Sequence, residues 1–261
     1  MRDKSCLFGA FAASIGFYLI LSMAPFMAVV IGSTFHFFHI DLTLPAITIL
    51  KDMLPPESRD NATGMVSAVS RIVEGSTLTV TLIFALVTTH SFMHALVRAL
   101  RYIFSTEQFL PKTTLTSTLI SMALVVLWAL VFAFFAIFIL ISPSIEVLLQ
   151  DLDLFSESAL WLWSLSKYFA TFFFVWLAIH LTYQLTDANR HPLNLRLQSS
   201  LLASVAWLGL GYAFSHIIPA LWSASMLHGT LGGLIALLIW AHATAWVLLL
   251  GACLVVRRFN G

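Results

Sequence analysis

The sequence predicts an all-α membrane protein, a bundle of six transmembrane helices with both ends of the chain in the cytoplasm. Of its 261 residues, 60% are hydrophobic and only 10% are charged. A soluble protein carries roughly 25% charged residues, so most of this chain must be surrounded by lipid. In addition, once the apolar runs are numbered as spans, the remaining charges sort by sign onto opposite sides of the membrane.

The apolar runs define the spans, since about 20 apolar residues are enough to cross the hydrocarbon core as a helix. We expect spans over residues 7–34, 76–98, 115–141, 159–183, 199–221 and 231–256. The first run follows a basic start and is much longer than a signal-peptide core of roughly 7–15 residues, so it is predicted to remain as an uncleaved span. Pro25 should kink it.

The segments between the runs are predicted as loops of unequal character. Residues 35–75 are too polar to span, and we expect short amphipathic helices there, lying along the outer interface. Trp161 and Trp163 stand at headgroup level where the fourth span begins. Residues 186–198 form a short inner loop, and turn signals place the connection between the last two spans at residues 219–233. No linker or repeat is visible, so residues 1–261 are predicted to form one membrane domain.

The charges orient this bundle, because Lys and Arg are retained on the cytoplasmic side during insertion. The Lys and Arg residues of the inner side are Arg2, Lys4, Arg98, Arg101, Lys112, Arg190, Arg196, Arg257 and Arg258. The acids of the outer side are Asp41, Asp52, Glu57, Asp60, Glu74, Glu146, Asp151, Asp153 and Glu157.

Several function classes are not supported. The net charge of +1 argues against a nucleic-acid partner, and two distant cysteines make no metal site. His90 and His94 have the spacing of a helical zinc site, but Ser91 stands where a metalloprotease has its glutamate. We expect no cofactor, no metal and no enzymatic activity.

Ionisable side chains inside the spans are the candidate binding residues, because placing them at membrane depth costs free energy. His90, His94, Arg98 and Arg101 follow one another at offsets of four, four and three residues, which places them on one stripe of a helix. With His180 at a similar depth, they suggest a basic cavity that opens to the cytoplasm and could receive an anionic headgroup or carry protons. Alternatively, the arginines are positive-inside anchors and the histidines bond to nearby carbonyls.

Three further groups lie deeper in the spans. Lys167 either snorkels outwards along its alkyl stem or lines a polar pocket with His216. His242 lies mid-span, and we expect it to be satisfied by an interhelical hydrogen bond. His216 and His242 are therefore assigned to a polar core.

Small residues indicate where helices approach closely. Gly9, Ala13 and Gly16 mark one side of the first span. Gly209 and Gly211 are expected to bend or pack the fifth span, and Gly229, Gly232 and Gly233 introduce the sixth.

Two stretches resemble the YihY/BrkB-like family of bacterial inner-membrane proteins. They are Gly16-Phe-Tyr-Leu-Ile-Leu-Ser-Met-Ala-Pro25, and His228 to Trp240 followed by Leu249-Leu-Gly-Ala252. The resemblance implies six spans with cytoplasmic termini in a bacterial inner membrane. It also implies a transport-related role, including for lipid-like molecules. The family's old label of ribonuclease BN finds no support in these residues.

The chain departs from the family pattern at a few positions. His228 and His242 stand where tyrosines are usual, and Cys253 stands where a glutamate is usual. Ser199-Ser200 replaces a Gly-Ala pair. A role of that glutamate would have to be lost or relocated in this chain.

The leading expectation is a transporter or flippase-like permease for a small anionic or amphiphilic, lipid-like solute. Its substrate-binding residues would be His90, His94, Arg98, His180 and Lys167, and membrane lipids are the expected surroundings. The alternative is a non-transporting membrane scaffold or regulator of envelope assembly, which would contact a partner through its outer surface.

Overall fold

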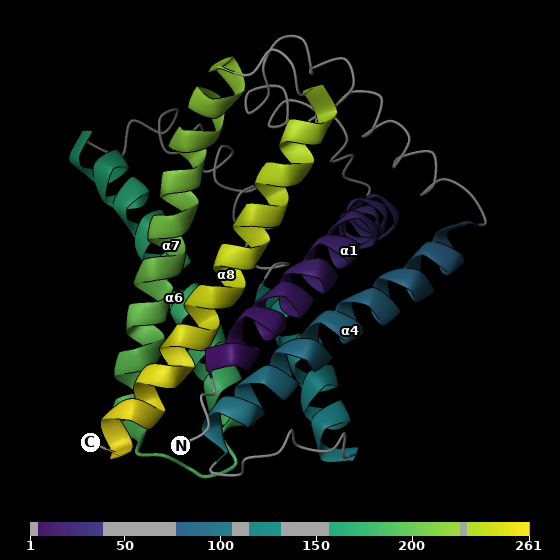
Figure 1. Ribbon diagram of the computed structural model, residues 1–261. Helices are drawn as coiled ribbons and strands as arrows, with labels where there is room; N and C mark the ends of the chain where they lie inside the picture. Colours follow the sequence, from purple (N-terminus) through teal and green to yellow (C-terminus); the bar gives the residue numbers. More distant parts are fainter. Residues whose placement is uncertain (1–4, 39–76, 106–114, 132–156, 225–228, 261) are drawn as a thin grey trace. The chain divides into compact units, whose positions relative to one another are not determined.

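Every element that the structure describes is an α-helix, as the sequence predicts. The computed structural model describes residues 5–38, 77–105, 115–131, 157–224 and 229–260, and these ranges contain no strand. The helices labelled in Figure 1 are α1 (Ser5–Phe38), α4 (Thr77–Phe104), α6 (Glu157–Thr186), α7 (Leu193–Ala224) and α8 (Gly229–Asn260). A shorter apolar helix covers Leu115–Val131.

Four of the described helices are long and apolar enough to cross a membrane. Their apolar stretches are Thr79–Phe104, Trp161–Thr186, Leu193–His216 and Ile235–Phe259. Shorter apolar stretches, Phe8–Met23 and Leu115–Val131, fall within the first and third predicted spans. The molecule is thus a helical membrane protein. The total of six spans and the cytoplasmic position of the termini stay predictions, and most of the predicted interfacial segment lies outside the described residues.

The helices extend beyond the predicted span ends. Helix α4 runs on past Arg98 to Phe104, and α8 runs on past Val256 to Asn260. Helix α1 continues to Phe38, so the first residues of the segment predicted at 35–75 are helical. The reason is that polar residues mark the edge of the hydrocarbon layer, whereas a helix ends only where its backbone hydrogen bonds find other partners.

Both predicted connections are shorter in the structure. Helix α7 continues through Pro219 to Ala224 and α8 begins at Gly229, so the turn predicted at 219–233 was too wide. The inner loop predicted at 186–198 is also too long, because α7 already begins at Leu193. Pro192 precedes this first helical turn and its carbonyl accepts from the Arg196 N–H at 3.3 Å. A proline there removes no intrahelical bond, since the first N–H groups of a helix have no partner within the helix.

The described helices belong to two compact units. Unit 1 comprises Met1–Ala99 with Gly209–Leu249, and unit 2 comprises Leu100–Leu208 with Leu250–Gly261, each within the described ranges. Helices α4, α7 and α8 contribute residues to both. The prediction of one membrane domain stays a prediction.

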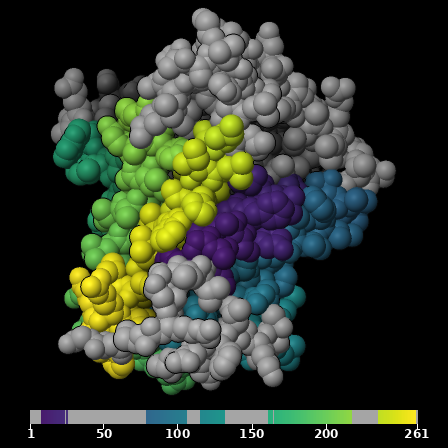
Figure 2. Space-filling view, viewed as in Figure 1, coloured from purple at the N-terminus to yellow at the C-terminus, as the bar shows by residue number. Residues whose placement is uncertain are grey.

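Unit 1 is assembled around α1. Figures 1 and 2 show α1 beside α8 on one side and beside α4 on the other. The buried residues of α8 in this unit include Ala241 and Ala245, four residues apart, which give that helix a face of small side chains. Gly16 of α1 meets this face: a Cβ on Gly16 would lie 3.3 Å from the His242 backbone nitrogen. The close approach predicted for Gly16 is confirmed.

Three of the other glycines predicted at close approaches, Gly9, Gly209 and Gly211, have no close neighbour, whereas the surroundings of Gly229, Gly232 and Gly233 lie outside the described part of the chain. A Cβ on Gly9, Gly209 or Gly211 would meet nothing within 4 Å among the described residues. Gly209 and Gly211 were expected to bend or pack the fifth span; the packing alternative is therefore wrong, and the bending alternative stays a prediction. Composition marks a position where close approach is allowed, but the neighbouring helix decides whether it happens.

Unit 2 is built on the α6–α7 pair. The fully buried side chains of α6 include Ile179, Thr182 and Tyr183. Thr182 connects α6 to the helix Leu115–Val131, because the indole N–H of Trp128 donates to its Oγ1 at 3.2 Å. The C-terminal end of α8 packs here through Gly251, where a Cβ would overlap the Tyr183 hydroxyl and lie 2.9 Å from Ala203 Cβ.

Candidate functional site

The predicted basic stripe lies on α4, with His90, His94 and Arg98 in unit 1 and Arg101 in unit 2. His90, His94 and Arg98 are half-buried on α4, and the two imidazole rings are 5.9 Å apart between centroids. His90 Nδ1 and Arg98 Nε are buried and have no hydrogen-bond partner among the described residues. The stripe is thus a real cluster of basic groups. Its role in binding an anion stays a prediction.

His180 lies in unit 2 and has its own surroundings. It is buried on α6, and its Nδ1 lies 3.4 Å from the Ser200 hydroxyl oxygen on α7. The indole of Trp176, one turn earlier, stacks on the ring with centroids 6.0 Å apart. These neighbours fit a histidine held within a helix pair.

Lys167 and His216, which were predicted as possible partners in one polar pocket, belong to different units. Lys167 is half-buried on α6 in unit 2, and its carbonyl oxygen accepts from the Thr171 hydroxyl at 2.8 Å. His216, assigned to a polar core, is instead exposed on α7 in unit 1. Its Nδ1 lies 2.9 Å from the Tyr212 carbonyl oxygen of its own helix. A helical carbonyl one turn earlier is available to any residue, which is why a histidine within a predicted span need not be in a core.

His242 does line a cavity. It is half-buried on α8, and its Nε2 accepts a hydrogen bond from the indole N–H of Trp246 at 2.9 Å. The predicted interhelical bond is therefore wrong, because the partner lies four residues later on the same helix. This spacing places the two rings above one another on one face. Phe8 of α1 packs against the Trp246 indole with ring centroids 5.2 Å apart.

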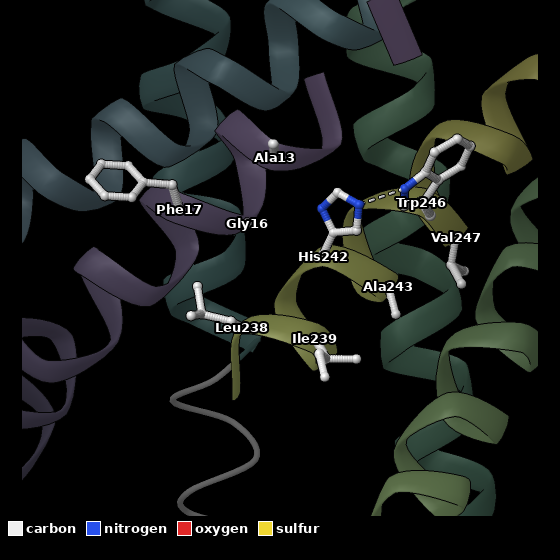
Figure 3. Close-up of a pocket in the computed structure, with 9 residues that line it drawn as sticks. All are labelled: Ala13, Gly16, Phe17, Leu238, Ile239, His242, Ala243, Trp246 and Val247. Carbon is white, nitrogen blue, oxygen red and sulfur yellow. Dashed lines mark hydrogen bonds between the residues drawn. The ribbon is translucent and has the colours of Figure 1, made fainter. Parts of the chain in front are cut away.

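Around this pair, α1 and α8 enclose a groove, which we call the α1–α8 groove. It has a volume of about 670 Å³, and Figure 3 shows the residues that line it. The lining residues are Ala13, Gly16, Phe17, Leu238, Ile239, His242, Ala243, Trp246 and Val247. Apart from the His242–Trp246 pair, these side chains are apolar. The groove can hold a largely apolar molecule and offers it one polar contact.

Helix packing explains why the groove has this shape. Gly16 allows the α1 backbone to approach His242, while Ala13 and Ala243 keep the walls on either side low. Phe17 and Ile239 are exposed at its margin. Small residues at the crossing and large residues at the margin leave a hollow accessible from the side.

The family model described as Virulence factor BrkB matches residues 7–258, nearly the whole chain. The chain belongs to the BrkB family. Searches of the curated proteins and of the solved structures found no significant match.

The BrkB-family block Leu249 to Ala252 now has a structural explanation. Gly251 lies in it, and no larger residue fits beside Tyr183 and Ala203 without displacement. Two residues that were expected to differ from the family pattern have defined surroundings in the structure. Ser200 is the polar partner of His180, and His242 is the polar residue of the groove.

Sequence reasoning missed one cluster of this BrkB-family chain, at the turn between α6 and α7. The carboxylate of Asp187 is buried, accepts the His191 backbone N–H at 2.8 Å and lies 2.8 Å from His191 Nδ1. The Arg196 guanidinium lies 3.8 Å from the same carboxylate. The spacing of Asp187 and His191 is visible in the sequence, but both residues fall within the inner loop predicted at 186–198.

The turn is held further by its other residues. Arg190 adopts a left-handed backbone conformation with a φ of 52°. Asn189 donates its side-chain amide to the Phe104 carbonyl at 2.7 Å, at the C-terminus of α4. The ring of Phe259 meets the His191 ring edge-on at 5.0 Å. The Asp187 carboxylate, the His191 imidazole and the Asn189 amide each have a partner within unit 2, so this cluster is well explained as a structural lock.

No group of three or more His, Cys, Asp or Glu side chains in the described part of the chain is arranged to hold a metal ion.

Proposed function

We propose that this BrkB-family protein is a permease of the flippase-like type, which moves an amphiphilic, lipid-like molecule within the bacterial inner membrane. The observation that carries the proposal is the α1–α8 groove, an apolar hollow of about 670 Å³ with one imidazole–indole pair in its wall. Pockets that bind small molecules measure roughly 300–1,000 Å³ and combine an apolar lining with few polar groups. The groove fits this description.

The surroundings of the groove select the kind of ligand. Its α8 wall belongs to the stretch Ile235–Phe259, which is the most apolar of the candidate spans, with a mean hydropathy of 2.0. Exposed apolar side chains at its margin, such as Phe17 and Ile239, would face lipid chains in a membrane. A ligand would therefore enter sideways from the bilayer, which favours a molecule with hydrocarbon chains over a water-soluble one.

The basic stripe of α4 supports a preference for anionic molecules. His90 and Arg98 carry buried nitrogen atoms without hydrogen-bond partners among the described residues. A negatively charged headgroup would supply acceptors to such donors, and charge-assisted hydrogen bonds are the stronger kind. We assign the stripe to headgroup binding and the α1–α8 groove to the hydrocarbon part. His180 and Lys167, both in unit 2, receive no role in this proposal.

The proposal is tested by filling the groove. Purified protein would be reconstituted into vesicles that contain a fluorescent anionic phospholipid, and movement between leaflets would be followed by chemical quenching of the outer leaflet. Ala13→Phe places a ring inside the groove and should slow lipid movement several-fold. Ala10→Phe is the matched control, because Ala10 is exposed on the same helix and does not line the groove.

Two results would contradict the proposal. Wild-type vesicles that move the lipid no faster than protein-free vesicles would argue against lipid movement of this kind. Equal rates for the Ala13→Phe and Ala10→Phe proteins, with the wild type active, would exclude the groove as the route.

A further inference from the structure

We infer that His242 recognises a neutral hydrogen-bond acceptor on the bound amphiphile, an ester or carboxyl carbonyl next to its hydrocarbon chain, through its Nδ1–H group. The inference rests on the proposed function, since it specifies what the α1–α8 groove selects. It is carried by the geometry of the imidazole within the groove.

The Trp246 contact decides which ring nitrogen of His242 carries the proton. An indole N–H only donates, so the nitrogen that it meets must be an acceptor. Trp246 Nε1 lies 2.9 Å from His242 Nε2. Nε2 therefore accepts this hydrogen bond through its lone pair and bears no hydrogen. A neutral imidazole carries its single hydrogen on the other nitrogen. His242 Nδ1 is consequently a donor.

This donor has no partner among the described residues. The only hydrogen bond of the His242 side chain there is the one to Trp246. His216, another histidine of unit 1, differs in this respect, because its Nδ1 lies 2.9 Å from the Tyr212 carbonyl of its own helix. In Figure 3 the His242 ring stands between the α1 ribbon and the Trp246 indole, with Nε2 directed at the indole. The Nδ1 edge is therefore turned away from Trp246, towards the α1 side of the groove.

An unpaired N–H group at membrane depth favours a ligand that pairs it. Water is absent from the hydrocarbon core, and leaving a polar group unsatisfied there costs free energy. The groove lining contains no acid and no hydroxyl that could accept from Nδ1. The acceptor must then come from the ligand.

The chemical class of that acceptor follows from the same residues. The donor is neutral, so it does not require a charged partner, and the walls on both sides, Ala13 and Leu238 among them, are apolar. A carbonyl flanked by hydrocarbon, as at the head of an acyl chain, satisfies both conditions. An alkane as long as that acyl chain would also contact the apolar walls of the groove, but it would leave the His242 Nδ1–H group without an acceptor.

Quenching of Trp246 fluorescence tests the inference, because bromine atoms quench an indole that they contact. The purified full-length protein in detergent would be titrated with a dibrominated fatty-acid methyl ester and with a dibrominated alkane of equal length. The chain has eight tryptophans, so the Trp246 signal is taken as the difference between the wild type and Trp246→Phe. The ester should bind the wild type about three- to tenfold more tightly than the alkane, the range expected for one net hydrogen bond.

The variants separate recognition from groove binding. His242→Phe keeps the ring shape without a donor and should bind both probes equally. His242→Gln can accept from Trp246 and donate to the ligand, so it should restore the preference and guards against a folding defect of the phenylalanine variant. His216→Phe is the control and should keep the full preference.

Each remaining outcome has a definite meaning. Equal binding of ester and alkane to the wild type, or an unchanged preference in His242→Phe, overturns the inference and leaves the α1–α8 groove as a hydrocarbon site. Quenching by neither probe removes the groove-binding step on which the proposed function itself depends.

Discussion

The hydroxyl group of Tyr183 on α6 occupies the space into which a side chain at Gly251 on α8 would grow. Tyr183 is fully buried, and its ring meets that of Phe104 edge-on at 6.0 Å between centroids. The phenol therefore has little room to move away. This contact determines how closely α8 approaches α6 within unit 2.

Replacing Gly251 with alanine should destabilise the protein by about 1–3 kcal/mol, the usual cost of overpacking a tight core. Gly209→Ala is the matched control. Its Cβ would meet nothing within 4 Å, so no loss is expected. Thermal unfolding in detergent micelles would measure both. The double variant Tyr183→Phe with Gly251→Ala should lose less stability than the sum of the single variants, because removing the hydroxyl makes room. Strict additivity would contradict the contact.

The Asp187–His191 pair should be essential to the α6–α7 turn. Asp187→Ala leaves a buried backbone N–H and an imidazole nitrogen of His191 without their acceptor, at a cost of about 1–3 kcal/mol. Asp187→Asn keeps one oxygen for the backbone N–H and should lose less. Gln184→Ala, an exposed change on α6, should have no measurable effect. Chemical unfolding in mixed micelles gives the ranking, and equal stability of Asp187→Ala and wild type would be the contrary result.

Asn189 should protect the end of α4. Its amide donates to the Phe104 carbonyl, one of the last carbonyls of that helix and therefore without an intrahelical partner. We expect Asn189→Ala to cost about 0.5–1.5 kcal/mol and to speed amide hydrogen exchange around Phe104. Asn194→Ala, which changes an exposed asparagine in the first turn of α7, is the control. Unchanged exchange at the end of α4 would show that this bond does not hold the helix.

The predicted topology has a direct test. Alkaline phosphatase is active only outside the cytoplasm, whereas green fluorescent protein fluoresces well only inside it. Fusions of this protein to one or the other reporter therefore identify opposite sides of the membrane. Six spans with cytoplasmic termini predict fluorescence from fusions after Gly261 and after Arg190, and phosphatase activity from fusions near Pro56 and Glu146. A phosphatase-positive fusion after Gly261 would exclude an even number of spans with a cytoplasmic N-terminus.

The prediction of helices succeeded because membrane depth permits few alternatives. Backbone groups without water must bond within their own segment, so a long apolar run becomes a helix whatever its neighbours are. Gly16 was also identified correctly, since a small residue in such a run often lies at a helix crossing. The ends of α4, α7 and α8 were placed less well, because charged residues such as Arg98 and Arg196 leave the hydrocarbon without leaving the helix.

The candidate site was harder to predict because it depends on which side chains contact each other in the folded protein. His242 was recognised as a costly mid-span group, but its partner Trp246 could not be chosen over a residue of another helix. Asp187 was counted as a loop acid, although its carboxylate is buried in the turn. His216 was assigned to a core and is exposed.

By itself, the sequence determined the helical class, the membrane environment and the BrkB-family resemblance, because these depend on composition and on the order of residues along one segment. Only the tertiary structure decided that α1 and α8 leave a groove beside His242, and that Gly251 rather than Gly209 is a close contact. Such features depend on which helix faces meet, and hydrophobic helices in lipid can meet in many ways with similar composition. Side-chain shape at each crossing selects among them.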